Sequence, residues 1–246
     1  MEFLIIFLAV LIGSLIAFYI YSQSVNTLSE RSSEISTTAV PEPKLSAVII
    51  YDKNHGFGLL QKVLTTAKVD VKAIPVDQIT FSDLVQYDIV ICVADVGNVP
   101  QALNTMQRLL EMGKEAILFY ECGKGLSQYA GAGSGHYGTG TDTIPASKKV
   151  TIDVSDYCVG FCDGLIDTYM VAATPISYIK TECSHPSLIR FRYEDPQNPG
   201  TYKESDLLCV SQKRAYISID VEAALKEGWP GLDRLIINVV TQLTGK

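Results

Sequence analysis

The sequence has few positive charges and lacks the basic runs that nucleic-acid-binding surfaces need. Its 246 residues hold 20 Lys and Arg against 27 Asp and Glu, a formal net charge of −7. No run of Lys or Arg is longer than two residues. Because a surface that binds phosphate groups needs a basic face, we expect no nucleic-acid partner.

Motifs for cofactors and metals are also missing. The glycine-rich stretch at 129–143 has no Gly-Lys-Ser/Thr, and it contains no Gly-x-Gly-x-x-Gly placed between a strand and a helix. Cys158 and Cys162 are separated by three residues, which is outside the two-residue spacing of thioredoxin-like sites, and the sequence has no second pair of residues at metal-ligand spacing. We therefore expect no cofactor and no metal. The glycine-rich stretch is interpreted as a flap or partner-contacting loop, and a local disulfide between Cys158 and Cys162 stays open.

The one long apolar run lies at the N-terminus. Residues 3–21 carry no charge, and 19 residues at helical rise come close to the hydrocarbon thickness of a bilayer. The two residues before the run include no Lys or Arg, and the bulky end of the run, 18–21, does not suit a signal-peptide cleavage site. We therefore expect a single-pass transmembrane anchor at 1–21, held in the bilayer through residues 3–21.

The segment after the anchor is polar. Residues 22–44 are rich in Ser and Thr and contain Pro41-Glu42-Pro43 near their end, which predicts a flexible tether without a packing face. Only Arg31 lies close to the anchor on this side, so the positive-inside rule leaves the membrane topology open. A polar stalk favours the extracytoplasmic side for the domain at 45–246.

Strands in this domain are predicted from continuous apolar runs. Residues 46–52, 88–94 and 115–120 are typical of central parallel strands, whereas 69–75 alternates in polarity and stops at Pro75, as an edge strand does. Short strand-like pieces follow from residue 149 to residue 219.

Helices are predicted between these strands. Amphipathic spacing indicates helices at 57–64, at 100–112 with Gly113 as C-cap, and at 232–243. The alternation of strands and helices predicts an α/β fold with a doubly wound, mostly parallel, flavodoxin-like sheet and added short strands.

The strand at 115–120 leads into Glu121, Cys122 and a glycine-rich turn containing Gly123 and Gly125. Ligands gather at the carboxyl ends of parallel strands. A cysteine that lies at the N-terminus of a following helix can be activated as a nucleophile by the helix dipole. The alternative is that Cys122 is a small apolar residue that closes the strand.

The order of these elements resembles the class I glutamine-amidotransferase-like superfamily, including its trehalose-utilisation-like and transporter-auxiliary variants. The resemblance rests on the opening strand 48–51, the strand at 87–91, the Gly113-Lys114 entry into the elbow strand, and the closing strand 216–220 with its helix. It covers most of 45–125 and 207–246, and it implies the fold more than an activity.

Active members of that superfamily carry Gly-x-Cys-x-Gly at the elbow and a later His-x-Glu. Here residues 120–124 read Tyr-Glu-Cys-Gly-Lys, and His185 is followed by Pro-Ser. A thiolate needs a base and a group that orients the base. His185 or His136 is the candidate base, and Glu121 or Asp220 the candidate orienting group. The departures from the pattern predict a catalytically degenerate member.

Three functions are compatible with these features. The first is a membrane-tethered, non-catalytic amidotransferase-like domain that serves as a binding or assembly subunit with other membrane-protein subunits. The second is a cysteine-dependent hydrolase or amidotransferase that uses Cys122, with the Gly123 amide as oxyanion donor. The third is a small-molecule sensor at the C-terminal strand ends, with Asp52, Asp95, Gly123 and Gly125 as ligand-binding residues. The anchor and the degenerate elbow favour the first.

Overall fold

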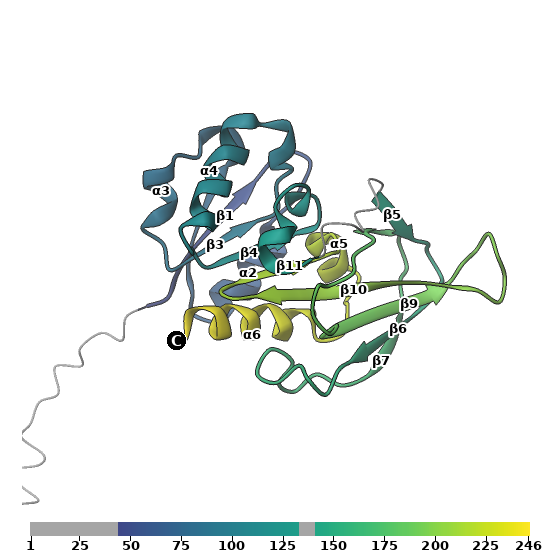
Figure 1. The fold of residues 1–246 in the computed structure, drawn as a ribbon. Coiled ribbons are helices and arrows are strands. Elements are labelled where there is room, and N and C mark those ends of the chain that lie inside the picture. The colour runs from purple at the N-terminus through teal and green to yellow at the C-terminus, as the bar shows by residue number, and fades with distance from the viewer. Residues whose placement is uncertain (1–43, 133–140) are drawn as a thin grey trace, which may run out of the picture. The chain divides into compact units, whose positions relative to one another are not determined.

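A nine-stranded sheet in the order β2-β1-β3-β4-β11-β10-β9-β6-β7 organises the domain (Figure 1). The computed structural model describes residues 44–132 and 141–246. The predicted anchor at 1–21 and nearly all of the predicted tether at 22–44 lie outside the described residues and stay predictions. Within the described ranges, no helix is both long and apolar enough to cross a membrane.

One half of the sheet is parallel. Strand β1 pairs with β2 and with β3, β3 pairs with β4, and β4 pairs with β11. The central strands read as continuous apolar runs because helices cover both of their faces. The strands of this half are β1 (Ser46–Tyr51), β2 (Asp70–Pro75), β3 (Ile89–Cys92), β4 (Ala116–Phe119) and β11 (Arg214–Ile217).

The other half is antiparallel. Strands β11, β10, β9, β6 and β7 pair in succession, so four antiparallel pairings continue the four parallel ones. Only Gln212 and Lys213 separate β10 from β11, and a connection this short permits antiparallel pairing alone. The remaining strands are β6 (Lys149–Val154), β7 (Thr168–Val171), β9 (Ile189–Glu194) and β10 (Tyr202–Ser211), and the separate two-stranded sheet of β5 (Thr141–Ile144) with β8 (Ile176–Ile179).

Helices cover both faces of the sheet, as a doubly wound fold requires. Successive residues of β1 point to opposite faces: Ile49 packs with α2, α5 and α6, and Val48 packs with α3 and α4. The predicted helix at 100–112 is present as α4 and is followed by Gly113 at φ +85°. The helices are α2 (Gly58–Thr66), α3 (Phe81–Val85), α4 (Pro100–Glu111), α5 (Val221–Lys226) and α6 (Leu232–Thr244).

All six cysteines are paired. Cys92–Cys122 joins the end of β3 to the turn after β4, and Cys183–Cys209 joins the segment before β9 to β10. The local bond between Cys158 and Cys162, which the sequence left open, is formed.

Candidate functional site

The turn after β4 begins with a strained residue. Tyr120 follows the last residue of β4 and has φ +39°, a left-handed conformation that is unusual for a residue with a side chain. Strain of this kind is concentrated at functional sites. The sequence pointed to Cys122 as the elbow residue, but the strained position is Tyr120, two residues earlier. Burial raises the pKa of the Tyr120 hydroxyl.

Tyr216 of β11 holds this turn in place. Its hydroxyl donates to the Tyr120 carbonyl at 3.2 Å, and its ring lies against Gly123. A Cβ at position 123 would be 2.2 Å from Cε2 of that ring, so only glycine fits here. Gly123 is therefore required by packing, whereas Gly125, at φ +78°, has open space around it.

The environment expected for a nucleophilic Cys122 is absent. The sulfur is bonded to that of Cys92, and both side chains are 0% exposed. The expected helix is replaced by two four-residue 3₁₀ turns, η3 (Tyr120–Gly123) and η4 (Ser127–Ala130). The left-handed glycines at 125 and 131 interrupt the backbone on either side of η4, which leaves no α-helical N-terminus to act on a thiol.

The predicted catalytic partners are not assembled around Cys122. His185 is exposed and forms no hydrogen bond or ion pair with any residue that the structure describes. Asp220 caps α5 by accepting a hydrogen bond from the Ala223 N–H at 3.1 Å. His136 lies at 133–140, outside the described residues.

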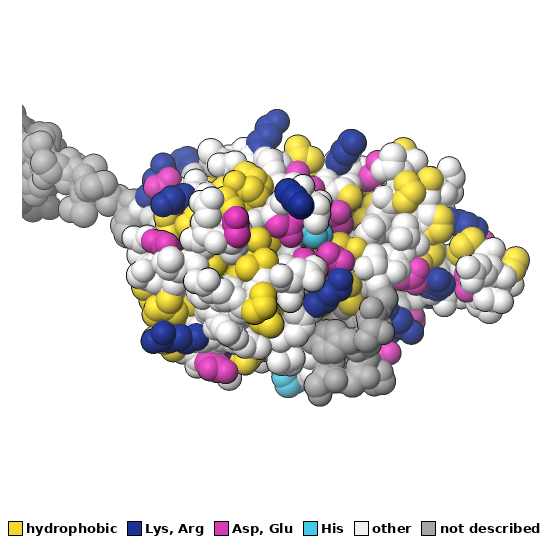
Figure 2. All heavy atoms as spheres, turned by 90° about the horizontal axis from the view of Figure 1, so that it is seen from above, with side chains coloured by type: hydrophobic (Ala, Val, Ile, Leu, Met, Phe, Trp, Pro, Cys, Tyr) yellow, Lys and Arg dark blue, Asp and Glu magenta, His cyan; other side chains and the backbone are white. Residues whose placement is uncertain are grey.

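Glu121 instead belongs to a group of charged side chains at the C-terminal strand ends. His55 Nδ1 lies 2.9 Å from Asp52, and its Nε2 lies 3.2 Å from Glu121 Oε2. Lys124 Nζ donates to Glu121 Oε1 at 2.6 Å. We call Asp52, His55, Asp95, Glu121 and Lys124 the strand-end cluster. Figure 2 shows one histidine among acidic and basic side chains near the middle of the face viewed there.

Both nitrogens of His55 face carboxylate oxygens, Nδ1 that of Asp52 and Nε2 that of Glu121. The imidazole thereby links the loop after β1 to the turn after β4. Asp52 also accepts hydrogen bonds from the N–H groups of Asn54 and Asp95. Burial acts to raise the pKa of Asp52, but these donors and His55 outweigh it and hold the pKa below its usual range.

A pocket of about 480 Å³ opens beside this cluster. Of the four predicted ligand-binding residues, Asp52 and Asp95 line it, whereas Gly123 and Gly125 do not. Its other polar lining comes from Lys53, Asn54, Asp77 and Asn98. One cation among three carboxylates makes the pocket unsuited to phosphate and suited to a small polar molecule that hydrogen-bonds with carboxylates and amides.

The arrangement of strands and helices is found in other solved structures. The domain is similar to a ThuA-like protein from Bacteroides uniformis, with a TM-score of 0.58 at 11% identity over 82% of this chain and 91% of that chain. It is also similar to PurLQS from Thermotoga maritima, with a TM-score of 0.51 at 13% identity over 81% of this chain and 98% of that chain.

The domain has an amidotransferase-like fold. A similar domain forms part of alpha-L-fucosidase isoenzyme 2 from Paenibacillus thiaminolyticus, with a TM-score of 0.53 at 13% identity over 82% of this chain and 33% of that chain. No protein-family model matches the sequence, and no curated protein is significantly similar to it. At these identities the likeness concerns the fold alone.

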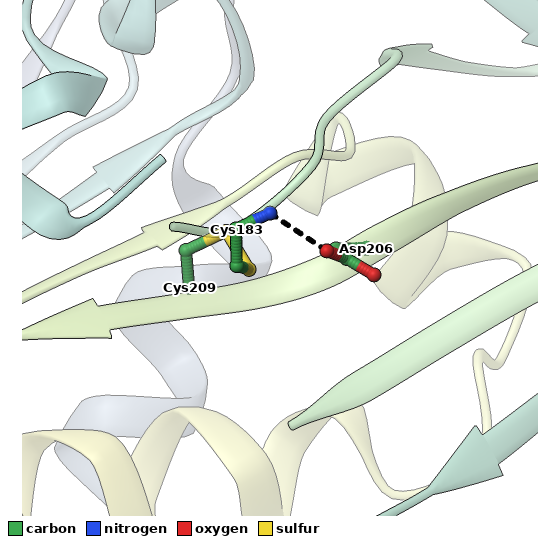
Figure 3. Close-up of side chains that lie close together, drawn as sticks. All are labelled: Cys183, Asp206 and Cys209. Carbon is green, nitrogen blue, oxygen red and sulfur yellow. Dashed lines mark hydrogen bonds between the residues drawn. A yellow bond between two sulfur atoms is a disulfide. The ribbon is translucent and has the colours of Figure 1, made fainter. Parts of the chain in front are cut away.

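The domain also brings together Cys183, Asp206 and Cys209 (Figure 3). Side chains of these types can bind a metal, but here the two sulfurs are bonded to each other. Asp206 accepts hydrogen bonds from the Cys183 N–H at 2.7 Å and from Arg190 Nε at 3.0 Å. With no thiolate present, the group holds the segment before β9 against β10 and does not fit a metal site.

Three residues of the candidate site were not among those predicted from the sequence: His55, Tyr120 and Lys124. His55 lies in the loop directly after β1, four residues beyond Tyr51, so its position close to a strand end was the available signal. It was interpreted only as part of a turn. The strained backbone at Tyr120 could not be predicted, because a tyrosine in the sequence does not indicate a left-handed conformation.

Proposed function

We propose that this chain is a membrane-tethered, non-catalytic amidotransferase-like domain that serves as a binding or assembly subunit of a membrane complex. The observation that carries the proposal is the bond between Cys92 and Cys122, both fully buried. It occupies the sulfur on which the cysteine chemistry of the superfamily would depend. The strained residue of the turn after β4 is Tyr120 and not Cys122, and Tyr120 is 7% exposed.

The disulfides also support an extracytoplasmic location. Disulfides persist in oxidising compartments and are rare in the reducing cytosol. Three bonds that use every cysteine of the chain are in keeping with a domain held outside the cytoplasm by the predicted anchor at 3–21.

The cysteine-enzyme alternative meets two obstacles. The Cys92–Cys122 bond must first be reduced, and a base must then reach a sulfur that is 0% exposed. His185 is exposed and has no partner among the described residues that would orient it. General-base catalysis needs a base within about 3.2 Å of the proton it removes.

The non-catalytic character is tested with the full-length protein in detergent. Ammonia release from glutamine is measured with and without a dithiol reductant, for the wild type and for Cys122→Ser. We expect both proteins to match the buffer blank under both conditions. Turnover by the wild type that Cys122→Ser abolishes would establish the enzyme alternative.

The assembly role is tested separately, by purifying the tagged full-length chain from native membranes after mild cross-linking. The proposal predicts a defined membrane-protein partner in constant stoichiometry with the chain. A chain that purifies alone at every cross-linker concentration would contradict the proposal.

A small-molecule sensor is the second candidate, favoured by the pocket that Asp52 and Asp95 line. Thermal unfolding of the full-length chain with a panel of small polar molecules tests it. A binder should raise the wild-type midpoint and lose that effect in Asn98→Ala, which alters the lining and leaves Asp52 with its donors. If no molecule in the panel changes the midpoint at millimolar concentration, the sensor candidate falls.

A further inference from the structure

Exposed apolar side chains are concentrated on one stretch of the domain. Of the nine large hydrophobic residues that are exposed among those described, five lie between residues 157 and 171. Contiguous exposed apolar patches mark interaction sites. We call the loop 155–167 and strand β7 the loop–edge surface. Its exposed apolar residues are Tyr157, Val159, Ile166, Tyr169 and Val171, at 57–80% exposure.

The loop is held firmly in this conformation. The Cys158–Cys162 bond closes it, and Asn238 of α6 donates to the carbonyls of Phe161 and Asp163 at 3.1 Å each. Arg234 of α6 also donates to the loop, through the Gly164 carbonyl, at 3.1 Å. Because these contacts fix the loop before any partner arrives, binding to it costs little ordering entropy.

Strand β7 is an unprotected edge of the nine-stranded sheet. The opposite edge, β2, carries Asp70, Lys72 and Pro75, which discourage pairing with another chain. Strand β7 reads Thr-Tyr-Met-Val, with no charge and no proline. Figure 1 shows β7 as the last strand on its side of the sheet. An extended segment can add to such an edge through main-chain hydrogen bonds.

Two adjoining cavities lie at this surface, one apolar and one lined in part by carboxylates. The first, about 270 Å³, is apolar and has Ile152, Trp229 and Leu235 in its lining. The second, about 480 Å³, is lined in part by the carboxylates of Asp156, Asp163 and Asp167. None of these three carboxylates forms an ion pair with a described Lys or Arg.

We propose that the loop–edge surface binds an extended segment of a partner membrane protein that carries both apolar and basic residues. The segment adds as a strand beside β7, places an apolar side chain in the first cavity, and places Lys or Arg at the three carboxylates. The inference rests on the proposed assembly role and specifies the partner. The three carboxylates argue against two other occupants of this surface, a second copy of the chain and an anionic bilayer. A second copy would bring six carboxylates together, and an anionic bilayer would be repelled by them.

The binding experiment uses the full-length chain in phosphatidylcholine nanodiscs. The probe is a fluorescent nine-residue peptide of alternating Val and Lys with a central Tyr, and its counterpart carries Glu for Lys. Fluorescence anisotropy should show the Lys peptide binding at least about tenfold more tightly than the Glu peptide. Equal binding of the two peptides, or no binding of either, would overturn the proposal.

Variants locate the binding. Val171→Asp on the edge and Ile166→Asp on the loop should each weaken the Lys peptide about tenfold or more. Tyr202→Asp, an exposed apolar position outside 157–171, is the matched control and should bind as the wild type does. If Ile166→Asp and Val171→Asp both bind the Lys peptide as the control does, the assignment of binding to the loop–edge surface is wrong. A wild-type dimer that Val171→Asp dissociates in sedimentation would assign the surface to a second copy and overturn the proposal.

Photo-cross-linking in native membranes separates this inference from the proposed function. A photoreactive residue at position 171 should capture a membrane protein through a basic segment, and one at position 112 should not. Capture from position 112 alone, or of an acidic segment from position 171, overturns the inference and leaves the assembly role standing. If neither position captures a protein and the chain also purifies alone, both the further inference and the proposed assembly role are contradicted.

Discussion

The sulfur of Cys122 is bonded to the sulfur of Cys92 at 2.06 Å, and this bond ties the turn after β4 to the end of β3. Both side chains are 0% exposed. The cysteine that the sequence offered as a candidate nucleophile is thereby built into the core. At the strand ends, the side chains that remain contact one another, and His55 Nε2 lies 3.2 Å from Glu121 Oε2.

Removing this bond should destabilise the domain without unfolding it. The two cysteines are 30 residues apart, and releasing a closed loop of that size costs about 3–4 kcal/mol in the chain-entropy account. Urea unfolding of residues 44–246, which form a compact unit, measures the loss for the Cys92→Ala/Cys122→Ala pair. Cys158→Ala/Cys162→Ala, with a separation of 4, is the control and should lose less. Equal losses would show that loop closure is not the dominant effect.

Gly123 should not tolerate a methyl group. A Cβ there would meet the Tyr216 ring at 2.2 Å, and that ring is 1% exposed and fixed by its hydrogen bond to Tyr120. We expect Gly123→Ala to lower the free energy of unfolding by about 1–3 kcal/mol through overpacking. Gly58→Ala is the matched control, because nothing lies within 4 Å of its added Cβ, and it should stay within about 0.5 kcal/mol of the wild type. Unfolding curves that coincide for the two variants would contradict the packing at position 123.

Asp52 should make the domain sensitive to acid. The pKa of Asp52 is lowered in the folded chain, so the ionised side chain contributes stability above its unfolded value of 3.8. That contribution is lost as the pH falls through the lower folded pKa. Asp52→Asn should therefore be less stable than the wild type at pH 7, with the difference shrinking below about pH 3.8. A difference that is constant between pH 7 and pH 3 would show that Asp52 contributes through packing alone.

Much of the fold could be predicted from the sequence. Continuous apolar runs gave the positions of β1, β3 and β4, and spacing gave α4 with its terminal Gly113. The order of the strands could not be predicted in this way. Strand β11 lies between β4 and β10, and no local sequence pattern specifies that it pairs with β4. The antiparallel pairing in the other half is determined by short connections, such as the two-residue link between β10 and β11. This pairing can be predicted only if both strands that the link joins have been identified in the sequence.

The site was predicted only in part. Asp52 and Asp95 were predicted to lie together because residues after central strands lie at the same edge of the sheet, and both line one pocket. The partner of Cys122 was not found, since six cysteines allow 15 pairings and the correct one depends on β3 lying beside β4. His55 was overlooked because its bond to Glu121 joins residues 66 positions apart in the chain.

The most direct test of the central claim is a thiol map of the full-length protein, isolated from its native membrane with an alkylating reagent present throughout. After denaturation without reductant, peptide mass spectrometry should find all six cysteines unalkylated and a cross-linked peptide that contains Cys92 and Cys122. Complete alkylation of Cys122, with a reduced Cys92 beside it, would contradict the account and return Cys122 to the candidate nucleophiles.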